Sequence, residues 1–170
     1  EDDFPLTLRL LKEIHGKILK GVRGQYKSPG SFRTSQNWIG GASINTASYI
    51  PPTAEDMIPA LTNLEKYMHD FRPMPVLIKI GLIHSQFETI HPFLDGNGRV
   101  GRLLVTLLLC QYGLLSKPAL YLSEYFKAFR SEYYDNLNAV HEKGDYEGWL
   151  KYFIEGVWLV AEEATNTAKK

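Results

Sequence analysis

The stretch Arg99–Tyr112 is apolar on nearly every side of the helix that it would form. A helix that is hydrophobic all round is normally buried by its neighbours, so we expect this one to lie at the centre of the fold. The stretch Pro75–Thr89 precedes it and has one strongly apolar face, which predicts a second central helix. Two such helices need others to cover them, and this favours an all-α fold. The apolar positions are Val76, Leu77, Ile80, Ile83 and Phe87 in the first helix, and Leu103, Leu104, Val105, Leu107, Leu108 and Leu109 in the second.

Four further helices are expected around this central pair. Their ranges are Pro5–Lys20, Thr53–His69, Ser123–Lys143 and Asp145–Ala164. Thr53 is placed to cap the second of them, with Asp56 three residues later, and Gly144 separates the last two. The remaining stretch Gly21–Pro52 is rich in Gly, Ser, Thr and Asn, which is typical of a loop or hairpin. Within it, Ser31–Trp38 and Ser43–Ile50 could pair as two short strands about a Gly40-Gly41 turn.

The chain has 170 residues, of which 44% are hydrophobic and 22% charged, so we expect a single globular domain. Lys and Arg together number 19, as do Asp and Glu. This zero net charge argues against general binding to nucleic acid. Cys110 is the single cysteine, which favours a reducing compartment. We therefore expect a cytoplasmic protein with no membrane segment. Because the chain begins at Glu1 rather than at a methionine, we also expect it to be excised from a longer protein.

Between the two central helices lies a polar, glycine-rich turn, Asp95-Gly96-Asn97-Gly98-Arg99, whose composition contrasts with its surroundings. A local conflict of this kind often marks a functional site. The two glycines allow positive φ and let the backbone approach a ligand closely. The helix that follows offers unpaired N–H groups and the positive end of its dipole, which together predict an anion-binding site.

Charged side chains around this turn favour the same interpretation. Arg99 and Arg102 lie three residues apart in the first turn of the helix, where two cations oppose the helix dipole unless an anion binds there. Guanidinium groups suit phosphate oxygens, and Asp95 could hold a Mg²⁺ that bridges such phosphates. His91, four residues before Asp95, can act as a base near neutral pH.

Each of these features alone also has a purely structural interpretation. A histidine at a helix end is often structural, and Asp-Gly-Asn-Gly is a common turn sequence. The segment His91–Arg102 also lacks the Gly-Lys-Ser/Thr ending of a phosphate-binding P-loop and the dinucleotide fingerprint. His84 precedes His91 by seven residues, but no further His or Cys stands at metal-binding spacing, so we expect a structural role for it. The combination of base, acid, glycine turn and two arginines favours a functional site.

The segment His91–Arg102 resembles the signature of the Fic family, H-P-F-x-[D/E]-G-N-G-R-x-x-R, with every fixed position filled. The resemblance extends over most of the chain, including both central helices and the stretch Phe32–Gly40. It implies a single Fic-type helical bundle over residues 1–170, in which a small β-hairpin flap, at about residues 31–50, lies over the active site. The activity that it implies is protein adenylylation, in which AMP moves from Mg-ATP to a Tyr, Thr or Ser hydroxyl of a target protein.

The resemblance also implies a role for the residues of the signature. His91 would take the proton from the target hydroxyl, which attacks the α-phosphate of ATP. Asp95 would coordinate Mg²⁺ on the α- and β-phosphates. The nucleotide-binding residues would be Gly96, Asn97 and Gly98 as an anion-binding nest, Arg99 and Arg102 on the β- and γ-phosphates, and Gly101 between the two arginines.

Two regions outside the signature are assigned by the same resemblance. Tyr133 and Tyr134 resemble a tyrosine pair that lines the base and ribose of the nucleotide, although two aromatic residues on a helix face also pack well into a core. Trp38, Ile39 and Gly40 belong to the flap, which aligns the target by β-strand addition. In the phosphorylating branch of the family the turn has a lysine near its end, so the glycines of Gly96-Asn97-Gly98 favour AMP transfer.

The inhibitory motif of many Fic proteins, [S/T]-x-x-x-E-[G/N], has no match within residues 1–170. Glu147-Gly148 and Glu155-Gly156 have its ending, but Lys143 and Lys151 stand where Ser or Thr is required. We expect the inhibitory helix to come from a segment before Glu1 or from a separate antitoxin-like protein.

Other functions stay open at this point. The same site could move UMP, GMP or a phosphocholine group, because the signature does not determine base specificity. It could also be a catalytically silent nucleotide-binding regulator, although an intact His91 speaks against this. A nucleic-acid-binding domain is disfavoured by the zero net charge. The apolar helices and ten tyrosines leave room for a homodimer.

Overall fold

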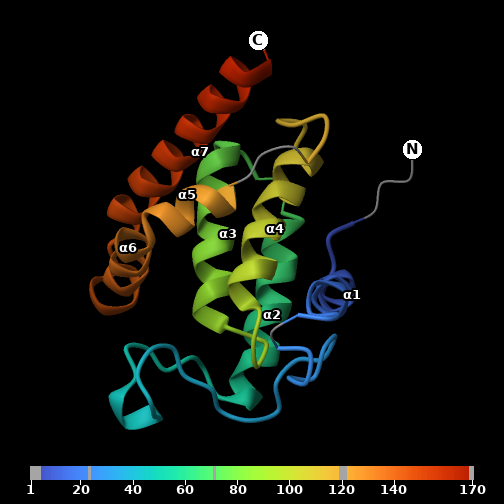
Figure 1. Cartoon of the computed structure of the whole chain (residues 1–170), viewed down its shortest axis with the longest axis vertical. Helices are drawn as coiled ribbons and strands as arrows, with labels where there is room; N and C mark the ends of the chain where they lie inside the picture. The colour runs from blue at the N-terminus through green and yellow to red at the C-terminus, as the bar shows by residue number, and fades with distance from the viewer. Residues whose placement is uncertain (1–4, 23, 71, 119–121, 169–170) are drawn as a thin grey trace. The chain divides into compact units, whose positions relative to one another are not determined.

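The computed structural model describes residues 5–22, 24–70, 72–118 and 122–168. Within these ranges the chain forms seven α-helices and one short 3-10 helix (Figure 1). The elements are α1 (Leu8–Ile18), η1 (Ile44–Thr46), α2 (Ala54–Met68), α3 (Val76–Ile90), α4 (Asn97–Gln111), α5 (Leu122–Ala128), α6 (Arg130–Lys143) and α7 (Tyr146–Ala168). The chain is therefore mostly helical, as predicted. No helix in the described ranges combines the length and apolarity that crossing a membrane requires.

The chain divides into two compact units. One comprises Glu1–Arg72 and Gln86–Gly101, and the other comprises Pro73–Ser85 and Arg102–Lys170. Both divisions fall inside a helix, so α3 and α4 each contribute residues to both units. The first unit contains the polar loop between α3 and α4, whereas the second contains α5, α6 and α7.

In the first unit, α1 and α2 pack together through their apolar faces. The Thr53 side chain caps α2 by accepting a hydrogen bond from the Asp56 N–H at 3.2 Å, as the sequence predicts. At the start of α1, the Leu8 N–H donates to the Glu65 carboxylate of α2 at 2.7 Å, which ties the two helices by a polar contact. The buried apolar residues on and next to these helices are Leu11, Leu19, Met57, Leu61, Leu64 and Met68.

In the second unit, α5 and α6 lie against α7 (Figure 1). An aromatic cluster fills these contacts. Trp149 of α7 is fully buried, and its indole N–H donates to the Gly81 carbonyl of α3 at 2.8 Å. His84 of α3 is also buried, and its Nε2 lies 2.9 Å from the Tyr133 hydroxyl of α6, which agrees with the structural role expected for this histidine. The aromatic residues of the cluster are Tyr125, Phe126, Tyr133, Trp149, Tyr152 and Phe153.

The single helix predicted over Ser123–Lys143 is wrong, because the chain breaks at Phe129 into α5 and α6. Phe129 has φ −104° and ψ 41°, outside the helical range. The break lets both halves pack on α7, since the Tyr125 ring lies 5.6 Å from that of Tyr152 and the Tyr133 ring lies 6.0 Å from that of Trp149. Tertiary packing of aromatic side chains therefore overrides a continuous helical pattern in the sequence.

The two paired strands predicted within residues 31–50 are also wrong. Ile39 and Tyr49 form one isolated antiparallel bridge, and the described residues of this segment contain no longer strand. Between them the chain makes a wide turn that contains η1, where the Thr46 hydroxyl accepts hydrogen bonds from the Ala42 and Ser43 N–H groups at 3.1 Å. This local bonding replaces the expected tight turn at Gly40-Gly41 and ends strand pairing after a single bridge.

Gly156 allows α5 to approach α7 closely, and this contact is testable. A Cβ at position 156 would lie 2.4 Å from the ring of Tyr125, which cannot move away without disturbing the aromatic cluster. Although alanine is favoured over glycine in a helix, we expect Gly156→Ala to lower the free energy of unfolding by about 1–2 kcal/mol through overpacking. Urea denaturation would measure this change.

Gly148 offers a matched control on the same helix. A Cβ there would meet only the exposed Asp145 side chain, at 2.6 Å from its carboxylate, which accepts a hydrogen bond from the Gly148 N–H. We expect Gly148→Ala to change the free energy of unfolding by less than about 1 kcal/mol. Equal effects of the two substitutions would contradict the close packing at Gly156.

Candidate functional site

The loop between α3 and α4 turns through two residues with left-handed backbone. His91 has φ +49° and Gly96 has φ +85°. For a residue other than glycine this conformation is sterically costly, and it is often found at functional sites. The positive φ favours glycine at position 96. Close packing favours it as well, because a Cβ there would lie 3.2 Å from the Leu19 side chain.

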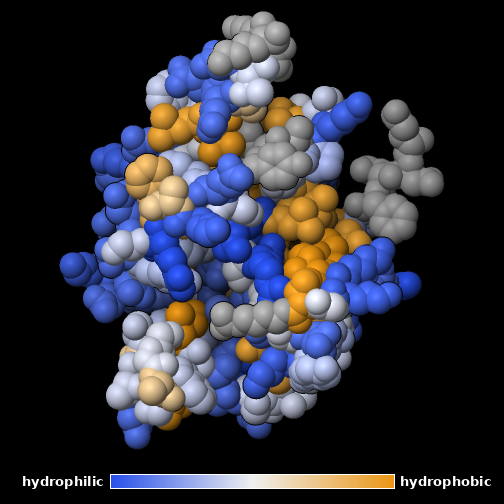
Figure 2. All heavy atoms as spheres, viewed as in Figure 1, coloured by the Kyte–Doolittle hydropathy of each residue, from blue (hydrophilic) through white to orange (hydrophobic). Residues whose placement is uncertain are grey.

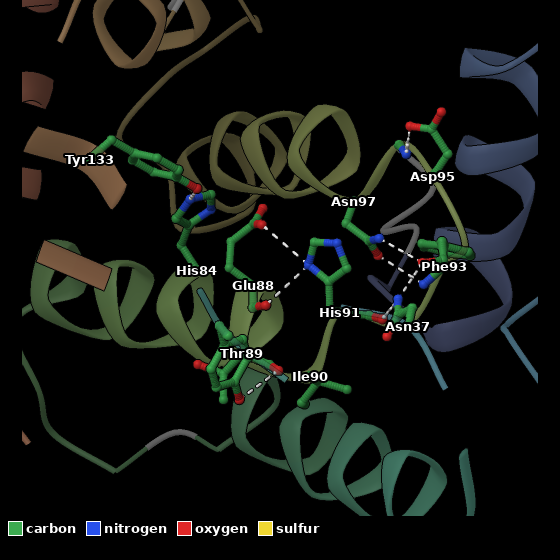
Figure 3. Close-up of polar contacts among 12 residues, drawn as sticks. Asn37, His84, Glu88, Thr89, Ile90, His91, Phe93, Asp95, Asn97 and Tyr133 are labelled. Carbon is green, nitrogen blue, oxygen red and sulfur yellow. Dashed lines mark hydrogen bonds and ion pairs between the residues drawn. The ribbon is translucent and has the colours of Figure 1, made fainter. Parts of the chain in front are cut away.

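The imidazole of His91 is largely buried, with 19% of its side chain exposed. Its Nδ1 lies 3.3 Å from the backbone oxygen of Glu88 and 3.9 Å from the Glu88 carboxylate oxygen Oε2 (Figure 3). Burial lowers the pKa of His91 to about 4, with the positive charge of Arg33 acting in the same direction and the Glu88 backbone bond and Asp95 opposing it. His91 is therefore neutral at pH 7 and keeps one ring nitrogen able to accept a proton.

The backbone of His91 is held by side chains from the segment that precedes α2. Arg33 is 2% exposed, and its Nε donates to the His91 carbonyl at 3.0 Å. The same guanidinium donates to the carbonyls of Ser35 at 3.1 Å and Pro52 at 2.5 Å. Asn37 Nδ2 also donates to the His91 carbonyl, at 3.3 Å. These bonds attach the base of the predicted flap to the end of α3.

Asn97, at the first turn of α4, closes the loop on itself. Its Oδ1 accepts a hydrogen bond from the Phe93 N–H at 2.8 Å, and its Nδ2 donates to the Phe93 carbonyl at 2.7 Å (Figure 3). The Asn97 side chain is buried, so it supports the loop and does not face a ligand. Its contribution to the predicted anion site is therefore limited to its backbone N–H group.

His15 of α1 supports the loop from the opposite side. Its ring stacks on the buried Phe93 ring, with centroids 3.8 Å apart. Its Nδ1 accepts a hydrogen bond from the Gly30 N–H at 2.9 Å, so its Nε2 carries the proton and donates to the Asp95 carbonyl at 2.9 Å. Burial lowers the pKa of His15, which keeps it in this neutral form. The ring thus fixes the backbone at the predicted metal-binding residue.

The side chains of Asp95 and Arg99 lie at the edge of this loop. Arg99 Nη2 is 3.4 Å from Asp95 Oδ1, and both side chains are about one third exposed. The Gly96 N–H donates to the same carboxylate oxygen at 2.5 Å. The other oxygen, Asp95 Oδ2, is close to Gly24, where a Cβ would lie 2.8 Å from it. A carboxylate and a guanidinium of opposite charge are therefore both partly exposed to solvent beside the N-terminus of α4.

The structure places the predicted site residues in both units. His91, Asp95 to Arg99 and Gly101 lie in the first unit, together with the flap residues Trp38, Ile39 and Gly40. Arg102 lies in the second unit, where its Nε donates to the Ser123 hydroxyl at 3.3 Å. Tyr133 and Tyr134 belong to the second unit as well, Tyr133 buried beside His84 and Tyr134 40% exposed.

No sequence pattern indicated a role for four side chains at the loop, namely His15, Arg33, Asn37 and Glu88. His15 carries the clearest signal, because it is a polar residue that recurs with Leu11 and Leu19 on the buried face of the first helix. Arg33 and Asn37 fall in a loop without periodicity. Nothing in their local sequence indicates that they reach the end of α3.

Replacing Asn97 tests how far the loop depends on its side chain. Asn97→Ala would leave the Phe93 N–H buried without its partner, while the Phe93 carbonyl keeps the bond from Asn37 Nδ2 at 3.1 Å. We expect the free energy of unfolding to fall by about 2–3 kcal/mol, as measured by urea denaturation. Asn136→Ala on α6, which removes a more exposed side-chain bond to the Glu132 carbonyl, should cost less than about 1 kcal/mol. Similar losses in both variants would contradict this role of Asn97.

The lowered pKa of His91 is testable by NMR titration of the ring protons. The chain has five histidines, and the signal missing from His91→Ala identifies the one of interest. We expect a midpoint at about pH 4, below the ordinary value of 6.5. Because the unfolded chain then binds this proton more tightly, His91 should make the folded state less stable as the pH falls from 6.5 towards 4. A midpoint at or above 6.5 would rule out the burial effect.

Comparison with known proteins shows which family the chain belongs to. Residues 5–109 match the Fic/DOC family. A relative named "Protein adenylyltransferase Fic" from Aedes aegypti is 30% identical over 160 residues, which cover 91% of this chain and 28% of that protein. The protein of the same name from Culex quinquefasciatus is 32% identical over 158 residues, with the same coverage of 91% and 28%. The chain therefore spans little more than a quarter of the length of these two relatives.

Solved structures agree on the fold. The crystal structure of a Fic family protein from Desulfovibrio desulfuricans is 24% identical with a TM-score of 0.78, and the match covers 94% of this chain and 47% of that one. The Fic-1 protein of C. elegans is 23% identical with a TM-score of 0.69, over 96% of this chain and 45% of that one. With more than half of its residues matched, and with the loop just described inside the matched range, the chain belongs to the Fic/DOC family.

Proposed function

We propose that this chain transfers AMP from ATP to a hydroxyl group of a target protein. The observation that carries the proposal is a largely buried, neutral His91 in the same loop as Asp95, immediately before α4, whose first turn carries Arg99. A base, a metal-binding carboxylate and an anion-binding helix end are the parts that nucleotidyl transfer needs. The names of the relatives from Aedes aegypti and Culex quinquefasciatus support the same activity.

His91 would act as the general base of this reaction. Its free ring nitrogen takes the proton of a Tyr, Thr or Ser hydroxyl, and the hydroxyl oxygen forms a bond to the α-phosphorus of ATP. The bond between the α-phosphorus and the bridging oxygen breaks, and pyrophosphate leaves with the bonding electrons. The low pKa supports this role because it keeps His91 unprotonated throughout the physiological range.

The N-terminus of α4 would bind the phosphates of the nucleotide. Its first N–H groups, at Asn97 and Gly98, would point along the helix axis towards an anion. Gly96 precedes them, and its N–H bonds Asp95 Oδ1. Arg99 would pair with the β- and γ-phosphates, with Arg102 and the small Gly101 on the following turn of the same helix. Tyr133 and Tyr134 are proposed to line the base and ribose, and this assignment rests on the family resemblance.

Asp95 is the residue that would hold Mg²⁺. Among the described residues no group of three or more His, Cys, Asp or Glu side chains is arranged to bind a metal. A single carboxylate fits Mg²⁺, which usually binds proteins through one or two carboxylates and completes its shell with substrate phosphates and water. When bound, the ion would neutralise charge on the α- and β-phosphates. His15 supports this arrangement by fixing the Asp95 backbone while the carboxylate stays partly exposed.

The segment around Trp38, Ile39 and Gly40 is proposed to align the target. The Ile39 N–H and carbonyl bond to Tyr49 and Ser48, so the backbone groups of its two neighbours face away from the bridge. An extended target segment can pair with that outer edge by β-strand addition. The whole stretch 34–54 lacks charged residues and forms the pale region at the lower left of Figure 2. Trp38, Ile44 and Ile50 are 40–51% exposed on it.

Three other elements of the proposal are carried by the sequence alone. An inhibitory helix from another segment or from an antitoxin-like protein would control the site. A homodimer and a cytoplasmic location stay predictions, the second because of the single Cys110.

The test of the activity is incubation of the chain with Mg²⁺, cell lysate and ATP labelled with ³²P at the α-phosphate. We expect label on protein with the wild type and a loss of at least about 100-fold with His91→Ala, since a general base typically contributes that much. His69→Ala is a matched control, because this histidine lies at the end of α2 and bonds the Leu6 carbonyl. Its label should equal that of the wild type.

Parallel reactions separate the alternatives. Label from γ-³²P-ATP that is present with the wild type and lost with His91→Ala would indicate phosphorylation by this chain and contradict AMP transfer. Transfer from labelled UTP, GTP or CDP-choline, but not from ATP, would keep the site and change the substrate. No transfer from any donor, despite ATP binding, would favour a silent regulator.

A further inference from the structure

Glu88 lies one helical turn before His91, on the last turn of α3. It is 6% exposed, and two of its oxygens face His91 Nδ1, the backbone oxygen at 3.3 Å and the carboxylate Oε2 at 3.9 Å (Figure 3). The backbone oxygen can only accept a hydrogen bond from the ring, and so can the carboxylate oxygen when Glu88 is ionised. The proton of neutral His91 therefore lies on Nδ1, and the lone pair lies on Nε2.

We propose that Glu88 is the positioning residue of the base: it fixes the Nδ1–H form of His91 and stabilises the imidazolium that arises when Nε2 takes the proton of the target hydroxyl. This inference rests on the AMP transfer proposed above, because it concerns the same histidine. No proton moves to Glu88 in this step. The hydroxyl O–H bond breaks, an Nε2–H bond forms, and the proton passes to solvent after the product leaves.

The position of Glu88 is unfavourable for the helix that carries it. A carboxylate near the C-terminus of a helix opposes the negative end of the helix dipole, and a buried carboxylate loses its hydration. A residue that violates local rules in this way often serves function rather than stability. A role beside the base would account for a carboxylate at a position where an apolar residue would pack at lower cost.

The charges around His91 show what Glu88 adds. Arg33, from the segment before α2, opposes protonation of the ring and has Tyr49 beside it, whereas Asp95 of the loop favours protonation. The Glu88 carboxylate also faces the ring, with Oε2 3.9 Å from His91 Nδ1. A negative charge there adds to that of Asp95 in balancing a positive charge on His91 against Arg33. The same division of roles exists in a catalytic triad, where an acid orients a histidine and stabilises its charged form without taking its proton.

The first test reads the tautomer of His91 directly. In the chain labelled with ¹⁵N at the histidine rings, we expect the His91 signals at pH 7 to show a protonated Nδ1 and an unprotonated Nε2, with assignment from His91→Ala. A proton on Nε2 would overturn the inference. This measurement needs no activity, so its failure is distinct from failure of the proposed AMP transfer.

The second test removes the charge with Glu88→Gln, which keeps the shape of the side chain. We expect kcat to fall about 10- to 100-fold with KM for ATP unchanged within about twofold, because the charge acts on the protonated base rather than on nucleotide binding. The NMR midpoint of His91 should also move to lower pH, since the imidazolium loses its counter-charge. Glu88→Asp, which retains the charge, should keep more of kcat than Glu88→Gln.

Gln86→Ala serves as the matched control, because Gln86 is exposed on the same turn of α3 and should leave kcat and the titration unchanged. Thermal unfolding of each variant separates loss of fold from loss of charge. A folded Glu88→Gln variant with wild-type kcat and an unchanged His91 midpoint would overturn the inference. So would equal kcat losses in Glu88→Asp and Glu88→Gln, since these would indicate a packing role.

Discussion

The site depends on the hydrogen bonds that hold the backbone of His91 in a left-handed conformation. This conformation costs roughly 1–2 kcal/mol for a residue with a side chain. Arg33 and Asn37 both donate to the His91 carbonyl, and the His91 N–H bonds the Phe87 carbonyl of α3. A net contribution of about 0.5–1.5 kcal/mol for each bond, and more for the charged donor, offsets the strain. The turn at His91 then directs the following loop towards the start of α4.

The same loop is supported by two neutral histidines in opposite proton arrangements. His15 carries its proton on Nε2 and gives it to the Asp95 carbonyl, whereas the surroundings of His91 favour a proton on Nδ1. The His15 ring thus uses both nitrogens to hold structure, whereas the His91 ring would use its Nε2 for the proposed chemistry. Burial lowers the pKa of each, so the low polarity around the loop also keeps both rings neutral.

The sequence predicted the features that depend on regular spacing and missed those that depend on particular side-chain contacts. Helical periodicity located α1, α2, α3, α4 and α7 to within a few residues, and the glycine-rich turn located the start of α4. The break at Phe129 was missed because aromatic packing on α7 causes it. The wide turn that replaces the hairpin was missed because the Thr46 hydroxyl, three to four residues away, bonds the backbone. Arg33 belongs to the stretch Phe32–Gly40 that resembles the family. Its bonds to the carbonyls of Ile90 and His91, 57–58 residues away, could not be predicted from that stretch.

The stretch 34–54 has a consequence for how a protein target would meet this site. With no charged side chain in the stretch, a target gains no long-range electrostatic attraction from it. Association through this surface would vary little with ionic strength, and its rate would depend on how often an extended segment is presented by the target. Pairing between two backbones also depends on few side chains of the target. Discrimination among targets would then come from which loops are accessible, rather than from a sequence motif around the acceptor hydroxyl.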